Sequence, residues 1–119
     1  MTELLDELRI INAKRLERWH GPNTEPWLGV DWSNAMGGEC GEAQNVVKKL
    51  RRLETGTRAQ DQPSFPELQK KLADEIADTI IYADLLASYY GIDLIEAIIR
   101  KFNFVSIREG FPERLRELG

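Results

Sequence analysis

The sequence predicts an all-α protein, and three observations lead to this expectation. Apolar residues recur every three or four positions in four separate segments, which is the spacing of one helix face. Glycine and proline separate these segments, and none of them alternates apolar and polar residues as a strand does. Because the chain has only 119 residues, it is expected to form one domain over residues 1–119.

The first two helices follow from this spacing. Apolar residues from Leu4 to Trp19 predict a helix over about 2–19, which the run His20-Gly21-Pro22-Asn23 stops. A loop with two prolines and two glycines then leads to Asp31 or Ser33, and either residue is a suitable N-cap for a second helix. The apolar face of that helix is expected to place Cys40 in the core together with Met36, Ala43, Val46, Val47 and Leu50.

The third helix is the most apolar one. Residues 51–66 show no period and are expected to form a surface loop, after which a helix runs from Pro66 to about Tyr90. Gly91 is well placed as the left-handed residue that ends it. Because its apolar side chains point in nearly every direction, this central helix is expected to be buried in a homo-oligomer, a homodimer or homotetramer. The residues concerned are Ile76, Ile80, Ile81, Leu85, Leu86, Ala87 and Tyr90.

A fourth helix completes the predicted four-helix protomer. Asp93, with Glu96 three residues later, resembles a capping box, and the apolar spacing continues through Val105. The tail after Gly110 is expected to pack as a short extra segment.

Composition and charge exclude several classes of function. A net charge of -4 and a pI near 5.1 argue against a protein that coats DNA or RNA. The start of the chain lacks a signal-peptide pattern, and Asp78 and Asp84 interrupt its longest apolar stretch, so no membrane partner is expected. A single cysteine forms no internal disulfide, which fits a cytoplasmic protein.

Two pairs of carboxylates carry the chemistry. Glu39 and Glu42 lie three residues apart in the second helix, and Glu75 and Asp78 repeat this spacing in the third. Side chains at i and i+3 project from one helix face, and here they border or enter the apolar stripes. Buried carboxylates need a cation, a proton or hydrogen-bond donors. Oxygen ligands in this number suit Mg²⁺, with Mn²⁺ as the second choice, and they do not suit Zn²⁺.

The alternative interpretation is that these acids are solvated and balanced by nearby lysines and arginines. One Glu-x-x-Glu pair on its own would favour that interpretation, because charged residues three apart are common on helix surfaces. Two such pairs on apolar faces of separate helices favour the metal site. A di-iron centre would require Glu-x-x-His motifs, and the chain contains none.

The two acidic segments also resemble a known family. Residues 38–43 (Gly-Glu-Cys-Gly-Glu-Ala) and 72–79 (Leu-Ala-Asp-Glu-Ile-Ala-Asp-Thr) look like the two signature segments of the MazG-like, all-α nucleoside triphosphate pyrophosphohydrolases. The resemblance spans about 31–108 and makes the predicted unit a single MazG-like domain. The family pattern is often written Glu-Glu-x-x-Glu followed by Glu-x-x-Asp, and this chain has Gly38 in place of the first Glu.

The resemblance implies both the ligands and the reaction. Glu39, Glu42, Glu75 and Asp78 would hold the metal, while water attacks the α-phosphorus of a nucleoside triphosphate. The products would be a nucleoside monophosphate and pyrophosphate. A carboxylate not fully used as a ligand would accept the proton of the water, and Glu42 is our choice for this role. The resemblance further implies triphosphate or sugar contacts in the fourth helix, made by Lys101, Asn103 and Arg108.

Other substrate contacts are suggested by position. Lys49 lies about two turns after Glu42 on nearly the same side of its helix, so it is a candidate for binding phosphate. Tyr82 follows Asp78 by one turn and would pack on the sugar or simply fill the core. Trp32, in the segment before the acidic helix, would stack on a base or pack against the protein.

Two functions therefore remain after reading the sequence. The first is a Mg²⁺-dependent pyrophosphohydrolase, with a deoxynucleoside triphosphate as the preferred substrate class. The second is an inactive helical oligomer that binds a nucleotide or a partner protein. The sequence does not determine the base, the sugar, the acid that acts as general base, the biological role, or dimer versus tetramer.

Overall fold

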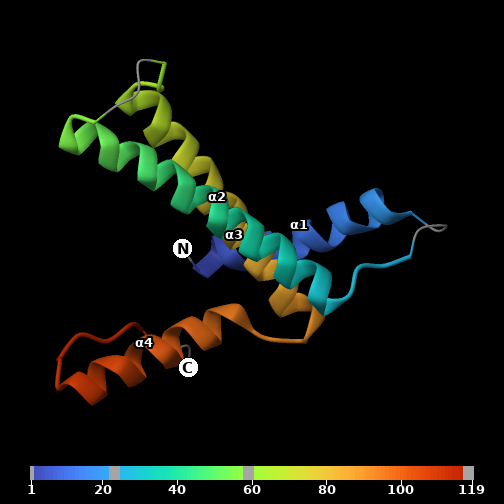
Figure 1. The fold of residues 1–119 in the computed structure, drawn as a ribbon. Coiled ribbons are helices and arrows are strands. Elements are labelled where there is room, and N and C mark those ends of the chain that lie inside the picture. The colour runs from blue at the N-terminus through green and yellow to red at the C-terminus, as the bar shows by residue number, and fades with distance from the viewer. Residues whose placement is uncertain (1, 22–24, 58–60, 117–119) are drawn as a thin grey trace. The chain divides into compact units, whose positions relative to one another are not determined.

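The computed structural model describes residues 2–21, 25–57 and 61–116. These residues form helices and no strands, so the all-α prediction is confirmed (Figure 1). Within the described ranges the helices are α1 (Thr2–His20), α2 (Gly29–Thr55), α3 (Phe65–Tyr89) and α4 (Leu94–Glu109). None of them is both long and apolar enough to cross a membrane.

The start of α2 corrects one prediction. Neither Asp31 nor Ser33 is the N-cap, because the helix begins at Gly29 and Leu28 takes the capping position with extended φ and ψ. Asp31 still serves the helix end, since its Oδ2 accepts a hydrogen bond from the Leu28 N–H at 2.9 Å. The carboxylate therefore acts from the first turn of the helix, where the exposed N–H groups also favour a negative charge.

The expected loop over 51–66 is shorter than predicted. Helix α2 continues to Thr55 and is ended by Gly56 in the left-handed conformation, at φ 73°. The apolar period stops at Leu50, but an Arg51–Glu54 ion pair at 2.9 Å supports one more turn. Helix α3 then begins at Phe65, after Ser64. Of this loop, residues 58–60 lie outside the described residues, as do Pro22 and Asn23 of the predicted stop after α1.

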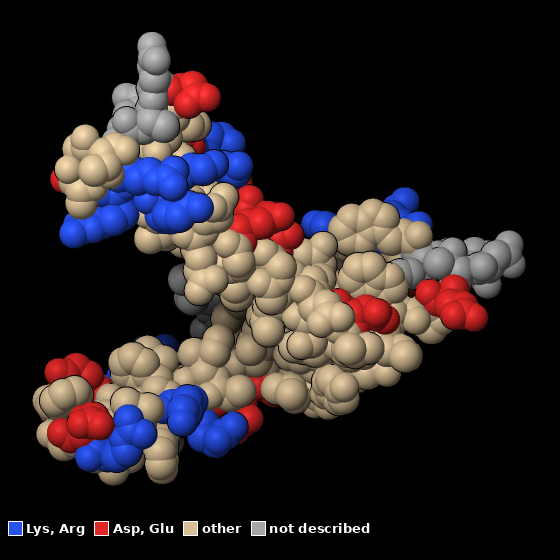
Figure 2. All heavy atoms as spheres, viewed as in Figure 1, with Lys and Arg blue, Asp and Glu red and all other residues tan. Residues whose placement is uncertain are grey.

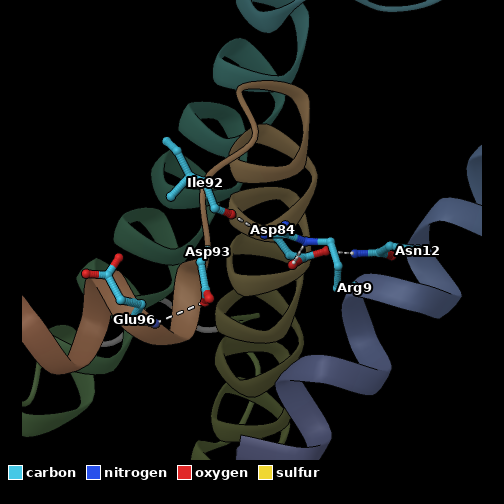
Figure 3. A network of polar contacts seen from close by, with 6 residues as sticks. All are labelled: Arg9, Asn12, Asp84, Ile92, Asp93 and Glu96. Atoms are coloured by element: carbon cyan, nitrogen blue, oxygen red, sulfur yellow. Dashed lines mark hydrogen bonds and ion pairs between the residues drawn. The ribbon is translucent and has the colours of Figure 1, made fainter. Parts of the chain in front are cut away.

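The turn between α3 and α4 agrees with its prediction. Gly91 has φ 66° and lies two residues after Tyr89, the last residue of α3. Asp93 caps α4 by accepting a hydrogen bond from the Glu96 N–H at 3.1 Å (Figure 3). A left-handed glycine ends one helix and a capping carboxylate begins the next, which are both local devices that can be recognised from sequence.

The chain divides into two compact units. One unit comprises residues 26–83, which hold α2 and most of α3. The other comprises residues 1–25 and 84–119, which hold α1, the last turns of α3, α4 and the tail.

In the unit built from both ends of the chain, a buried carboxylate joins three segments. Asp84 is 2% exposed and accepts hydrogen bonds from Arg9 Nε at 2.8 Å and Asn12 Nδ2 at 3.0 Å. The same guanidinium donates to the carbonyl oxygen of Ile92 at 2.9 Å (Figure 3). Helix α1 is thereby fixed to the end of α3 and to the turn that follows it.

The tail after α4 packs as expected, through one asparagine. The Asn103 Nδ2 donates to the Leu115 carbonyl at 3.0 Å, and the Leu115 N–H donates to Asn103 Oδ1 at 2.7 Å. Asn103 is itself buried. Both halves of its amide therefore bind backbone, which satisfies a polar group that would otherwise be costly to bury.

Much of the apolar surface of α2 and α3 is open in this single chain. Val46, Leu68 and Leu85 are buried, whereas Ile76 and Ile80 are 49% and 47% exposed. Cys40 is also exposed, so its predicted place in the core is wrong. The helical wheel identified the apolar side of α2 correctly at Val46, but a wheel does not show how far a neighbouring helix extends over that side.

Candidate metal centre

The candidate site lies between α2 and α3, which run antiparallel in the unit of residues 26–83. At one end the rings of Trp32 and Tyr82 approach to 6.2 Å between centroids. At the other end Gln62 Nε2 donates to the Lys49 carbonyl at 2.8 Å. The two helices form an antiparallel hairpin (Figure 1), and the predicted acidic residues of both lie between these two ends.

Three of the four predicted ligands converge. Glu39, Glu75 and Asp78 each offer one carboxylate oxygen, and these three atoms lie within 4.8 Å of one another. Ligand oxygens of an octahedral Mg²⁺ stand at about 2.1 Å from the ion and hence roughly 3 to 4 Å from each other. Small side-chain rotations would bring the three oxygens to that spacing. Two come from the Glu-x-x-Asp pair of α3 and one from α2.

Two of these carboxylates have oxygens that lack a partner. Oε2 of Glu39 and Oε2 of Glu75 are buried and form no hydrogen bond within the described part of the chain. An acceptor oxygen that is shielded from water and has no hydrogen-bond partner is unfavourable, and more so when it is charged. A cation bound between them would remove that cost, so the donor set fits a divalent metal ion.

Glu42 lies beside this triad and is exposed. Its pKa is raised above its ordinary value of 4.5, first because of a side-chain hydrogen bond with Glu75, then because of the negative charge of Glu75, and then because of desolvation. A hydrogen bond with Glu39 and the positive charge of Lys71 act in the opposite direction. Glu42 therefore holds its proton more strongly than a free glutamate does.

Glu75 is at the centre of the acidic group. Its pKa is also raised from 4.5, with a hydrogen bond that protonated Glu75 donates to Glu39 as the largest cause, and with desolvation and the charges of Glu39 and Asp78 adding to it. The hydrogen bond with Glu42 lowers the pKa of Glu75. Carboxylates this close disfavour one another's ionised forms unless a cation is present.

A polar pocket of about 450 Å³ opens next to the acids. Lys71 and Asn45 line it together with Glu42 and Glu75, and its remaining walls are Gly38, Gly41 and Val46. Sequence reasoning missed Lys71 and Asn45. The signal was present, because Lys71 precedes Glu75 by four residues and Asn45 follows Glu42 by three, which puts each on the same helix face as its acid.

Basic residues continue beyond the pocket. Figure 2 shows Lys and Arg side chains gathered at the end of the hairpin that carries the α2–α3 connection, with acidic residues adjacent to them. Lys49, the predicted phosphate ligand, lies in the second half of α2 and is half-buried. Its role toward a substrate stays a prediction.

The predicted aromatic contacts form a small cluster. Trp32 is 4% exposed and its ring lies 4.6 Å from that of Trp27. Its tilted contact with Tyr82 places both aromatic residues on the same end of the hairpin. Packing thus accounts for Trp32 without a ligand, while Trp27 is 41% exposed and offers more free surface.

The remaining predicted contacts lie in the other unit. Lys101 Nζ stands 5.3 Å from the ring of Phe104, and Arg108 pairs with Glu109 at 3.2 Å. Both the Nδ2 and the Oδ1 of Asn103 form hydrogen bonds with the backbone of Leu115, and this role explains an asparagine at that position without a substrate. The proposed phosphate and sugar contacts of these residues stay predictions.

Comparisons with models of known protein families and with curated proteins find no match for this chain. The resemblance to MazG-like enzymes therefore stays a prediction based on the two acidic segments. Function has to be inferred from the chemistry of the site itself.

Proposed function

We propose that this protein is a nucleoside triphosphate pyrophosphohydrolase of the MazG-like type that depends on Mg²⁺. It would cleave the α–β phosphate bond of a nucleoside triphosphate, with deoxynucleotides as the preferred class, and release a monophosphate and pyrophosphate. The observation that carries the proposal is the meeting of Glu39, Glu75 and Asp78, with two buried oxygens that lack partners.

The three converging acids are the proposed metal ligands, with Glu42 as a fourth ligand or a neighbour. Their hard oxygen atoms suit Mg²⁺, and Mn²⁺ would be accepted for the same reason. When bound, the ion would neutralise phosphate oxygens and lower the pKa of an attached water. Glu39 and Glu75 would then be relieved of the repulsion that raises the pKa of Glu75.

Glu42 is the proposed general base. It is exposed and it stands outside the converging triad, so its carboxylate is accessible to accept a proton from a water molecule. A water oxygen would form a bond to the α-phosphorus while Glu42 takes the water's proton. The bond from the α-phosphorus to the bridging oxygen would break, and pyrophosphate would leave with the bonding electrons.

The aromatic end of the hairpin is the proposed nucleoside side of the site. Tyr82, one turn after Asp78, would pack against the sugar, and the Trp27–Trp32 pair would contact the base. A phosphate contact is proposed for Lys49, and contacts by Lys101 and Arg108, which belong to the other unit, stay predictions. A nucleotide-pool enzyme of this kind would work in the cytoplasm.

We also propose that the working form is a homodimer or homotetramer. Val47 on α2 and Ile76 and Ile80 on α3 are each nearly half exposed. They belong to the same two helices as the site, and a second copy of the chain would cover them. This fits a short chain with few buried apolar residues within its described part.

A panel of nucleoside triphosphates incubated with Mg²⁺ tests the activity. We expect monophosphate and pyrophosphate, detected by ion-exchange chromatography, and no diphosphate. Glu75→Gln should lower kcat by about a hundredfold or more, because it removes a central ligand and a charge opposite the metal. The matched control is Glu67→Gln at the start of α3, which should keep activity near wild type.

Two results would contradict the proposal. One is the absence of pyrophosphate release for every triphosphate in the panel. The other is equal activity in wild type and Glu75→Gln, which would assign any hydrolysis to a contaminant. Either result would favour a helical protein that binds a nucleotide or a partner without catalysis.

A further inference from the structure

The polar pocket beside the acids has a composition that the metal ligands alone do not explain. At about 450 Å³ it is large enough for a small ligand. Two of its lining residues, Glu42 and Glu75, belong to the acidic group, and the remainder add one cation, one amide, two glycines and a valine. None of the described residues that line the pocket is aromatic, so they offer no ring on which a base could stack.

Lys71 is the cation of this pocket. It forms no ion pair with any residue that the structure describes, whereas its neighbour Lys70 pairs with Asp74 at 3.2 Å. Lys71 is near enough to the acids for its charge to act on Glu42. Lys71 is exposed at the wall of the pocket beside the acidic group, and an ammonium in this position is suited to bind phosphate oxygens.

The glycines of α2 leave the space in front of Lys71 open. Gly38 and Gly41 lie inside a helix, where glycine is less stable than alanine because it loses more backbone freedom on folding. A Cβ at either position would meet no atom within 4 Å, so packing in this chain does not require glycine there. Their effect is to let a ligand approach the helix closely from the pocket side.

The order of the features along the α2–α3 hairpin matches the order of the groups in a nucleoside triphosphate. Moving along it, the Trp32–Tyr82 contact comes first, the acidic group second, and the pocket with Asn45 and Lys71 third. A nucleoside triphosphate presents its base, its α-phosphate and its two terminal phosphates in the same order. With the α-phosphorus at the acids and the base at the aromatic end, the terminal phosphates extend into the pocket.

We propose that Lys71 and Asn45, with the open wall at Gly38 and Gly41, form the subsite for the β- and γ-phosphates of the substrate. The subsite orients the leaving pyrophosphate away from the nucleoside, and it retains pyrophosphate after cleavage. This inference rests on the proposed function for the identity of the substrate. The binding of pyrophosphate itself can be measured without turnover.

The first experiment measures binding of inorganic pyrophosphate in the presence of Mg²⁺ by isothermal titration calorimetry. Lys71→Gln should weaken binding by about tenfold or more, the usual loss for one charge-assisted hydrogen bond. Lys70→Gln, which removes the same charge one residue away, should stay within about twofold of wild type. Binding of the nucleoside monophosphate product should be unchanged in Lys71→Gln, because that product lacks the two terminal phosphates.

A second pair of variants tests the open wall without altering charge. Gly41→Leu should raise the melting temperature through its higher helix propensity and yet weaken pyrophosphate binding by about tenfold, because its side chain enters the pocket. Gly37→Leu makes the same exchange on α2 at a glycine that does not line the pocket. It should raise the melting temperature and leave pyrophosphate binding unchanged.

The outcomes separate this inference from the proposed function. If triphosphates are hydrolysed but Lys71→Gln and Gly41→Leu bind pyrophosphate like wild type, the subsite is wrong and the activity stands. If no triphosphate is hydrolysed while pyrophosphate binds through Lys71, the activity is wrong and the anion subsite stands. Failure of wild type to bind pyrophosphate with Mg²⁺, or loss of monophosphate binding alone in Lys71→Gln, overturns the subsite.

Discussion

Glu75 carries the sharpest conflict between burial and charge in the described part of the molecule. One of its oxygens is buried without a partner, and Glu39, Glu42 and Asp78 all act on its ionisation. The pKa values of Glu75 and Glu42 are both raised as a result. In the absence of metal, the folded protein therefore binds protons at this site more tightly than the unfolded chain does.

This conflict predicts how stability depends on pH. A carboxyl with a raised pKa in the folded state contributes stability that is fully present below about pH 4.5 and is lost as pH rises through the raised value. In EDTA, the free energy of unfolding from urea titrations should therefore fall between weakly acidic and neutral pH. The fall should be smaller in Glu75→Gln, and it should match wild type in the control Glu17→Gln on α1.

Mg²⁺ should reverse the trend at neutral pH. The ion binds only the folded arrangement of the acids, so millimolar Mg²⁺ should raise the melting temperature of wild type and have little effect on Glu75→Gln. In EDTA, the free energy of unfolding could instead rise with pH by the same amount in wild type and in Glu75→Gln. That result would show that these acids do not interact as the structure indicates.

For single residues, the sequence predicted the positions of the acids better than it predicted the residues around them. Spacing alone put Glu39, Glu75 and Asp78 on facing sides of two helices, because the helical period is fixed by backbone geometry. Lys71 and Asn45 were missed because only the antiparallel pairing of α2 with α3 places them at one pocket. Asn103 was expected near a substrate, and its bonds to Leu115 depend on a fold-back of the tail that no local pattern indicates.

Among the elements, α1 depends most on a single polar contact. Arg9 and Asn12 reach the buried carboxylate of Asp84, 75 and 72 residues away in the chain. Arg9 also holds the backbone of the α3–α4 turn at Ile92. Helix α1 is therefore joined to the other segments of its unit by an ion pair and by hydrogen bonds.

Removing Arg9 should consequently be costly. Arg9→Met leaves the Asp84 carboxylate buried without its guanidinium partner, although Asn12 still donates to it, and we expect a loss of about 3 kcal/mol in the free energy of unfolding. The double variant Arg9→Met with Asp84→Leu should recover part of that loss, because no buried charge remains. Urea unfolding of both variants decides the matter, and equal losses would show that the charge pair is not the cause.

The boundaries of the elements were predictable where the signal was local. Gly91 and Asp93 mark the α3–α4 turn through a left-handed residue and a side-chain cap, and each device acts within a few residues. The end of α2 was placed too early because its last turn is polar and held by the Arg51–Glu54 pair instead of an apolar stripe. Its start was misassigned because Asp31 serves the helix end from inside the first turn.

For the whole molecule, the question is what covers the apolar sides of α2 and α3. Ile80 is nearly half exposed, and so are Val47 and Ile76. A second copy of the chain is the proposed cover, and covering such residues is worth about 25 cal/mol per Å² of apolar surface removed from water. The working protein should then be a dimer or tetramer in solution.

A charged residue on that face tests the assembly. Wild type should show the mass of a dimer or tetramer by light scattering coupled to size exclusion, and Ile80→Asp should shift toward the monomer mass. Ile10→Asp, at an exposed apolar position of α1, should leave the mass unchanged. A monomeric wild type, or an unchanged mass in Ile80→Asp, would contradict assembly through α3.

Cys40 provides a natural position for labelling next to the proposed metal site. It is the single cysteine of the chain, it is exposed, and it sits between Glu39 and Gly41 on α2. A thiol-reactive fluorophore would therefore attach at one known place, next to a proposed metal ligand, without any engineered substitution. Its emission would follow the binding of ions and anions in real time, and the same label would report whether a second copy of the chain approaches α2.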